Sequence, residues 1–226
     1  MADYTLALEG STYAGSVALI CDREVIAERT LEDTGIPSRG GRDERVLPSV
    51  AECLETANVS PKELTRIVCG AGPGSFTSLR VSASVAKGIA VGTGRPLYAA
   101  SSLLLSVSAS AELRPGVYLS VLPAMRGEFF ASQIEILDSG EMRAAETVII
   151  AEADLAVAAH KLDAQIVGPG RDIDSMPRAR GVSRLLDQII SIGPVDIDTW
   201  EPAYGRLAEA QVKWEATHGR PLGAGA

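Results

Sequence analysis

Short apolar runs separated by turn residues dominate the first part of the chain. Such runs, bounded by Gly, Asp or Pro, are typical of buried or half-buried strands. We therefore expect strands at 4–8, 15–20, 24–30, 66–69 and 96–100. The three-residue link at 21–23 predicts that the second and third of these strands form a hairpin.

The period changes to that of a helix in two places between these strands. Apolar residues recur at helical spacing over about 43–57, with Asp43 as a candidate N-cap, and small residues fill 76–91 up to Gly92 and Gly94. Ser60-Pro61-Lys62-Glu63 has the composition of a capping box and predicts a short helix.

The second half repeats this order of elements. We expect strands at 117–122, 128–137, 147–150 and 165–168, and helices at 152–160 and 182–192. Each half then reads β-β-β-α-β-α, which predicts a duplicated α/β fold of the actin-like, ribonuclease H-like kind. We expect an N-terminal subdomain at 1–100 and a C-terminal one at 101–226 that includes a C-terminal helix.

Composition narrows the class of protein. Lys and Arg total 21 against 29 for Asp and Glu, a net charge of -8, so the chain alone is poorly suited to bind a nucleic-acid backbone. The three cysteines are scattered and form no disulfide or metal pattern. The start resembles no signal peptide and no apolar run has transmembrane length. We expect a cytoplasmic protein with no membrane partner.

The glycine-rich segment 70–75 is the clearest candidate for ligand chemistry. Gly72, Gly74 and Ser75 lie between a strand and a helix start, where exposed N–H groups and the helix dipole favour a phosphate. The alternative is a rigid turn that packs the helix on the sheet, and the lysine of a P-loop is missing. Glu9 follows the first strand, where nucleotide-binding duplicated folds usually carry an Asp.

Other candidate chemistry is weak. The two histidines, His160 and His218, have no neighbours at metal-ligand spacing, and Ser75 is not in a nucleophile elbow. We therefore expect no metal, no cofactor and no catalytic residue. A basic stretch from Arg171 to Arg184 is interrupted by acids, so it is either a solvated loop or a patch that faces tRNA within a complex.

Residues 70–80, GAGPGSFTSLR, resemble the GxGPGSFTGLR segment of the TsaB family, with Ser78 in place of a glycine. Residues 42–48 are similar to its HSERLLP, 8–12 to its IDTST, 122–128 to its DARRGE segment and 201–206 to its EPLYLR. The resemblance runs from about residue 5 to 212 and is strongest in the first hundred residues.

This resemblance implies a non-catalytic subunit in the synthesis of N6-threonylcarbamoyladenosine in tRNA. It implies a heterodimer with a catalytic TsaD subunit, which this chain stabilises and activates, engagement of the ATPase TsaE, and tRNA bound through the complex. A homodimer through the same surface is the form expected without the partner. One alternative is a stand-alone actin-like ATPase or kinase, against which Glu9 in place of the family's Asp counts. The other is a glycoprotease-type metalloprotease, against which the absence of the relatives' metal-binding HxxxH motif counts.

In the family, two helices of the first subdomain form a four-helix bundle with the partner, which implies a surface at about 44–58 and 76–91. Apolar positions of the first helix span a wide arc, and the second is rich in small residues that allow close approach. The alternative is that both helices only cover the sheet. The candidate partner-binding residues are Val46, Leu47, Val50, Leu54, Ala83, Ser84 and Lys87.

Overall fold

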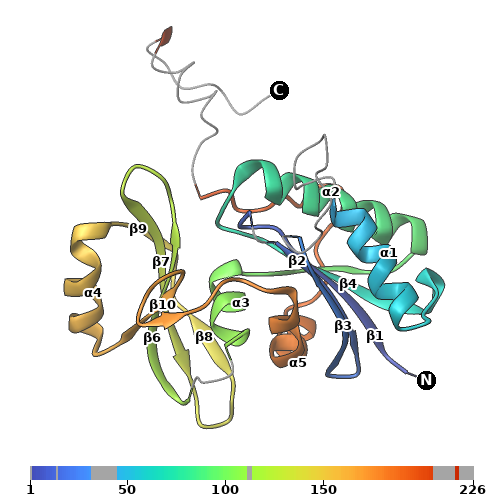
Figure 1. Ribbon diagram of the computed structural model, residues 1–226, viewed down its shortest axis with the longest axis horizontal. Helices are drawn as coiled ribbons and strands as arrows, with labels where there is room; N and C mark the ends of the chain where they lie inside the picture. The colour runs from blue at the N-terminus through green and yellow to red at the C-terminus, as the bar shows by residue number, and fades with distance from the viewer. Residues whose placement is uncertain (1, 14, 32–44, 111–113, 206–216, 219–226) are drawn as a thin grey trace.

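The computed structural model describes residues 2–13, 15–31, 45–110, 114–205 and 217–218. Two mixed β-sheets stand side by side, with helices on their outer faces and between them (Figure 1). The expectations for Asp43 and for the HSERLLP-like residues up to position 44 lie outside the described residues. Most of the chain after residue 205, where the C-terminal helix was expected, lies outside them as well.

The first sheet has the strand order β3-β2-β1-β4-β5. Its strands are β1 (Tyr4–Glu9), β2 (Ser16–Cys21), β3 (Glu24–Thr30), β4 (Leu64–Gly70) and β5 (Leu97–Ala100). Strands β1, β4 and β5 are parallel, and β2 and β3 form the expected antiparallel hairpin. Because side chains alternate across a sheet, Leu6 and Leu8 face one core while Ala7 faces another.

The second sheet repeats this order as β11-β10-β6-β7-β8, with β9 also paired to β7. Its strands are β6 (Gly116–Pro123), β7 (Glu128–Ile136), β8 (Met142–Ala144), β9 (Val148–Ala151), β10 (Gln165–Gly168) and β11 (Ile173–Asp174). Strands β6, β10 and β11 are parallel, as β1, β4 and β5 are in the first sheet. The repeated order confirms the duplicated α/β fold.

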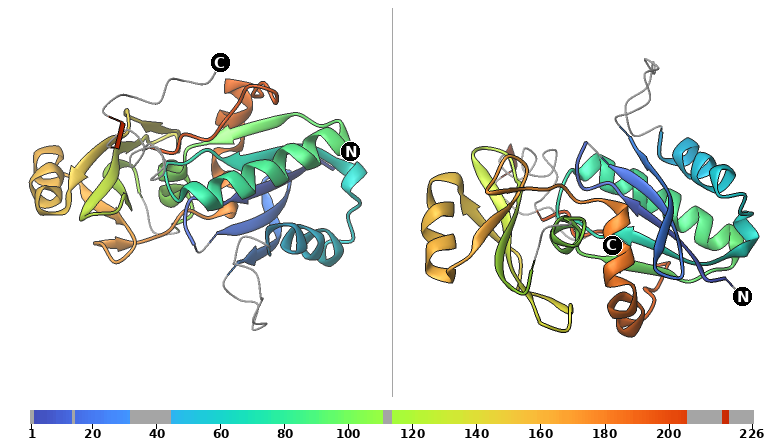
Figure 2. Two further views of the ribbon diagram at one scale, coloured as in Figure 1. Left: turned by 90° about the horizontal axis from the view of Figure 1, so that it is seen from above. Right: turned by 60° about the horizontal axis from the view of Figure 1, so that its bottom comes forward.

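The helices form three layers around the two sheets. They are α1 (Val46–Thr56), α2 (Phe76–Thr93), α3 (Ser102–Ser108), α4 (Leu155–Leu162) and α5 (Val182–Ile192), with 3₁₀ turns η2 (Pro61–Glu63), η3 (Glu152–Asp154) and η4 (Ala179–Gly181). Helices α1 and α2 cover the outer face of the first sheet, α4 that of the second, and α3 and α5 lie between the sheets (Figures 1 and 2). The apolar core is therefore divided into three clusters, of which the central one is shared by both sheets.

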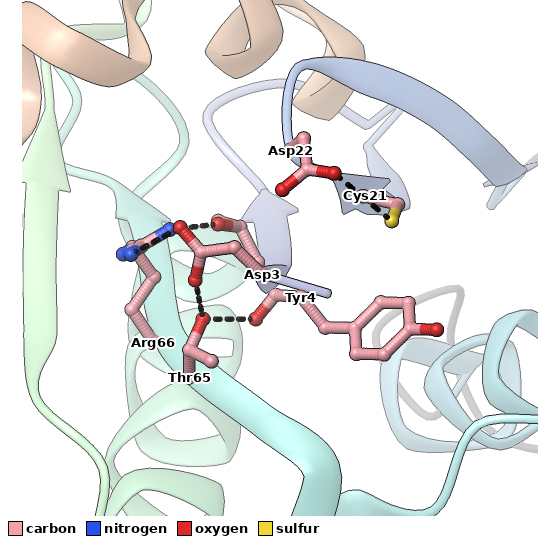
Figure 3. A network of polar contacts seen from close by, with 7 residues as sticks. Asp3, Tyr4, Cys21, Asp22, Thr65 and Arg66 are labelled. Atoms are coloured by element: carbon pink, nitrogen blue, oxygen red, sulfur yellow. Dashed lines mark hydrogen bonds and ion pairs between the residues drawn. The ribbon is translucent and has the colours of Figure 1, made fainter. Parts of the chain in front are cut away.

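A polar network fixes the start of the parallel pair β1 and β4 (Figure 3). The Asp3 carboxylate accepts hydrogen bonds from the Thr65 hydroxyl and from Arg66, 2.6 Å away, and Arg66 also donates to the Thr5 hydroxyl at 2.9 Å. Burial raises the pKa of Asp3, but the hydrogen bonds with Thr65 and Arg66 outweigh it and hold the pKa below 3.8. The network therefore ties the first residues of β1 to β4.

Most expected elements appear with similar bounds. The capping box of Ser60 and Glu63 is present, although it begins a 3₁₀ turn rather than an α-helix. Helix α3 and the short strands β8 and β11 were not expected. The sheets occupy residues 4–100 and 116–174, and α5 packs between them, so a division at residue 100 stays a prediction. None of the described helices has the length and apolar character needed to cross a bilayer.

Candidate partner-binding surface

Helix α1 packs one face on β2 and β3 and leaves the other outward. Val46, Val50 and Leu54 are buried in the first core, at helical spacing. Leu47, one residue along, is 58% exposed. The wide apolar arc predicted from the sequence thus divides into a buried face and an outward apolar residue.

Helix α2 runs beside α1 on the same sheet face and has clear ends. It begins after the turn at 72–75 and ends where Gly94 adopts a left-handed conformation with φ 67°. The Arg95 N–H bonds back to the Ala90 carbonyl, as in a Schellman cap. Ala83, Ala86 and Ala90 pack into the first core, and Leu79 is buried on the same side of the helix at helical spacing. Apolar residues at this spacing anchor the helix and set which face points outward.

The outward face of α2 carries a stripe of small residues. Ser84, Gly88 and Gly92 are exposed and four residues apart, so they lie one above the other on the helix. A Cβ atom added at Gly88 or at Gly92 would meet no atom within 4 Å. The chain's own packing therefore does not require glycine there. Val91, beside the stripe, is 70% exposed.

The segment 195–204 lies along α2 and β5. Trp200 packs against the first core, and the Lys87 ammonium lies 5.9 Å from its ring centre. Tyr204 contacts the Phe76 ring at 4.5 Å between centroids, and the Ala203 N–H donates to the Ala71 carbonyl. Lys87 is therefore held within its own chain by Trp200 at the edge of the stripe.

The structure separates the predicted partner-binding residues into two groups. Val46, Val50, Leu54 and Ala83 are buried against the chain's own sheet, whereas Leu47 and Ser84 are exposed and Lys87 is half-buried. The sequence alone did not predict Val91 and Gly92 as surface residues. Gly92 lies four residues after Gly88 and eight after Ser84, and this helical spacing is the signal that places it on the outward face of α2.

The glycine-rich loop has most of its N–H groups already bonded. The Ala71 N–H donates to Ala100, the Gly72 N–H to the Ser102 hydroxyl at 3.1 Å, and the Ser75 N–H to the Ser11 carbonyl at 2.7 Å. A Cβ atom added at Gly74 would lie 2.2 Å from that same carbonyl. These contacts describe a turn that packs closely on the β1–β2 loop, and phosphate binding at Gly72, Gly74 and Ser75 stays a prediction.

Glu9 lies under this loop with 1% of its surface exposed. Its carboxylate accepts hydrogen bonds from the Ser11 N–H at 2.6 Å and from the Ser102 hydroxyl at 3.1 Å. A Cβ atom added at Gly70 would lie 2.1 Å from a Glu9 oxygen. Burial raises the pKa of Glu9, while the hydrogen bonds from Ser11 and Ser102 oppose that shift. The carboxylate therefore points into the protein, and Ser102 is a partner that the sequence did not predict.

Metal ligands do not gather in the part of the chain that the structure describes. There, no group of three or more His, Cys, Asp or Glu side chains is placed to hold a metal ion. His160 lies in the last turn of α4, at the helix end that favours a cation.

Comparison with known proteins gives consistent matches. A family model described as TsaD, tRNA N6-adenosine threonylcarbamoyltransferase, matches residues 25–174, more than half of the chain. The tRNA threonylcarbamoyladenosine biosynthesis protein TsaB of Haemophilus influenzae is 32% identical over 135 residues, 57% of this chain and 52% of that protein. The protein of the same name from Bacillus subtilis is 26% identical over 230 residues, 92% of this chain and 96% of that protein.

A solved structure, YeaZ from Pseudomonas aeruginosa, superposes with a TM-score of 0.74 and 27% identity over 89% of this chain and 99% of that chain. The matched part of the chain spans about half the length of the Haemophilus protein and nearly all of the Bacillus and Pseudomonas chains. The resemblance to TsaB proteins seen in the sequence is thereby confirmed.

Proposed function

We propose that this chain, which belongs to the TsaD family of tRNA N6-adenosine threonylcarbamoyltransferase domains, is a TsaB-type partner subunit for threonylcarbamoyl transfer to tRNA. In this role it docks on a TsaD-type catalytic subunit in the cytoplasm and activates it. A TsaE-type ATPase and tRNA join through the assembled complex rather than through this chain alone, whose net charge is -8.

The small-residue stripe of α2 (Ser84, Gly88 and Gly92) is the observation that supports this proposal most. Helix axes approach within about 8–10 Å, and the smallest side chains at the contact allow the closest approach. Glycine in a helix interior costs roughly 1 kcal/mol relative to alanine. In the isolated chain no close contact gives a reason for a glycine at position 88 or 92. A partner helix laid along the stripe supplies that reason, with exposed Leu47 and Val91 as its apolar flanks.

The position of Glu9 supports a role without catalysis. In a nucleotide-using relative, an acidic residue after the first strand has to face the cleft to hold a metal ion that in turn binds the phosphate. Here the Glu9 carboxylate is buried and bonded to Ser11 and Ser102 instead. This arrangement favours the partner role over a kinase.

The test is Ser84→Arg, measured by calorimetric titration of the full chain with the TsaD-type subunit. Ser84 is exposed, so the variant should fold normally by circular dichroism. In the complex the guanidinium would be buried without a partner, which should weaken binding by at least about 3 kcal/mol, or roughly a hundredfold. Ala156→Arg, at an exposed alanine of α4 on the opposite side of the molecule, is the matched control.

Normal binding by the Ser84→Arg variant would exclude the stripe from the interface. Equal weakening by Ala156→Arg would show that added charge alone is responsible. Ala83→Arg is not informative, because Ala83 is buried in the chain's own core and its replacement should unfold the protein. Self-association through the same surface is the second candidate, and it predicts that Ser84→Arg lowers the mass of the isolated chain in sedimentation equilibrium.

A further inference from the structure

A cavity of about 820 Å³ lies between the two sheets, away from the α1–α2 surface. Its wall is formed by the end of α3, the start of α5, the segment 172–176 and Val25 of β3. Helices α3 and α5 pack against each other in this central layer (Figure 2). The cavity has the volume of an ordinary small-molecule site, which is about 300–1,000 Å³.

Three arginines of the basic stretch line this cavity: Arg178, Arg180 and Arg184. The Arg184 guanidinium donates to the Ser108 and Ser110 carbonyls, which are neutral acceptors and leave its positive charge in place. Arg180 lies 3.4 Å from Glu28 in a pair that is largely open to solvent on the arginine side. The sequence left this stretch open as a solvated loop or a tRNA-facing patch. In the structure these three arginines lie on one concave wall, whereas Arg171 is paired with Glu152.

One end of each of two helices lies on this wall. Ser183, in the first turn of α5, lines the cavity together with Arg184, and Ser108 lines it at the end of α3. The N-terminal end of a helix carries about half a positive charge and the C-terminal end about half a negative one, so these two contributions oppose each other. The attraction for an anion therefore rests on the guanidinium groups.

Two carboxylates, Asp172 and Asp174, also line the cavity, and both are engaged in their own loop. One oxygen of Asp172 accepts the Ile166 N–H at 3.0 Å, and one oxygen of Asp174 accepts the Gly170 N–H at 2.9 Å. The described lining thus holds three cationic side chains against two acidic ones, and Arg180 is in addition paired with Glu28 outside the lining. The wall therefore gathers three guanidinium groups at one place in a chain whose net charge is -8.

The rest of the lining combines serines with apolar side chains, of which Val25, Ile173 and Met176 are the largest. We propose that the cavity binds a small phosphorylated molecule with an apolar or planar portion, its phosphate held by the guanidinium groups. Arginine suits this ligand because its planar fork bonds two phosphate oxygens at once. An extended nucleic-acid backbone fits less well, since it needs a broad basic surface rather than a cavity.

The test is an NMR titration of the full chain with AMP as the probe, alongside adenosine and inorganic phosphate at matched ionic strength. AMP should shift the amide signals of 108–110 and 172–184 and bind more tightly than adenosine or phosphate. Absence of these shifts at about 10 mM AMP, above the millimolar range of weak sites, would overturn the proposal. So would equal affinity for phosphate and AMP, or shifts with a short RNA but not with AMP.

Two variants with opposite expected effects test the electrostatic assignment. Arg180→Gln should weaken AMP binding about tenfold, the loss expected from one charge-assisted hydrogen bond. Asp174→Asn keeps an acceptor for the Gly170 N–H and removes a repulsive charge, so it should tighten binding. The control is Arg143→Gln. Arg143 is an exposed residue of β8 that is paired with Glu141, and this variant should bind AMP normally. Changes in the same direction for Arg180→Gln and Asp174→Asn would contradict the assignment.

Discussion

Replacement of Gly88 by alanine should make the isolated chain more stable and its complex weaker. The added methyl group would meet no atom within 4 Å in the isolated chain. Alanine is favoured over glycine in a helix interior by about 1 kcal/mol, because glycine loses more backbone entropy on folding. For a chain of this size, that gain corresponds to a rise in Tm of roughly 2–4 °C.

Two other glycines near α2 provide controls with the opposite expected sign. Gly94 also has open space around it, but its φ of 67° is a conformation that costs an alanine about 1–2 kcal/mol. Gly10 has no room, since an added Cβ would lie 2.1 Å from the Ser82 hydroxyl. Overpacking of this kind costs about 1–3 kcal/mol. Gly94→Ala and Gly10→Ala should therefore both destabilise the fold.

Urea unfolding followed by circular dichroism measures the stability of the isolated Gly88→Ala chain. Calorimetric titration with the TsaD-type subunit measures the strength of its complex. Both are run at a concentration where the isolated chain is monomeric. A Gly88→Ala variant that is less stable than the native chain would show that this face of α2 is already occupied. A more stable variant that binds the partner as well as the native chain would refute the inference that the stripe contacts a helix.

Two further predictions concern pH. Burial raises the pKa of Glu9 above 4.5, so the folded chain binds protons more readily and loses stability as pH rises through the folded pKa. Glu9→Gln should therefore gain stability relative to the native chain as pH rises above about 4.5. A difference in urea midpoints that stays constant with pH would contradict this. Although burial raises the pKa of Asp3, its hydrogen bonds with Thr65 and Arg66 hold that pKa below 3.8, so the stability that the Asp3 carboxylate contributes is lost in acid. In Arg66→Gln the stability should therefore fall less steeply with decreasing pH than in the native chain. Parallel acid-unfolding curves of the two proteins would contradict this.

The sequence predicted the elements whose patterns are long and regular. Helix α5 has the expected bounds because its apolar residues recur at helical spacing. Strands β3 and β10 also have the expected bounds, because each holds a short apolar run next to turn residues. Helix α3 has no such pattern, since its serines as well as its leucines are buried between the two sheets. Strands β8 and β11 are too short for a period and form only because a neighbouring strand offers its edge.

The sequence predicted that the candidate surface lies on helices α1 and α2, but not which of their side chains face outward. A wide apolar arc in α1 indicates that some apolar side chains face outward, but it does not say which ones. The structure assigns Leu47 outward and Val46 inward because β2 and β3 lie on one side of the helix only. The bonds of Glu9 to Ser102 were beyond reach for a different reason, since they join residues 93 positions apart in the sequence.

A difference between the two duplicated halves explains why, in the described fold, one of them offers a two-helix surface. In the first sheet, α2 connects β4 to the adjacent parallel strand β5 and covers the outer face together with α1. In the second sheet, the equivalent strands β10 and β11 are joined by the short loop 169–172, and α4 covers the outer face alone. The helix at 182–192, counted in the sequence as the match of α2, instead packs between the sheets as α3 does. The paired helices therefore occur once in the described fold, on the sheet whose second helix carries the small-residue stripe.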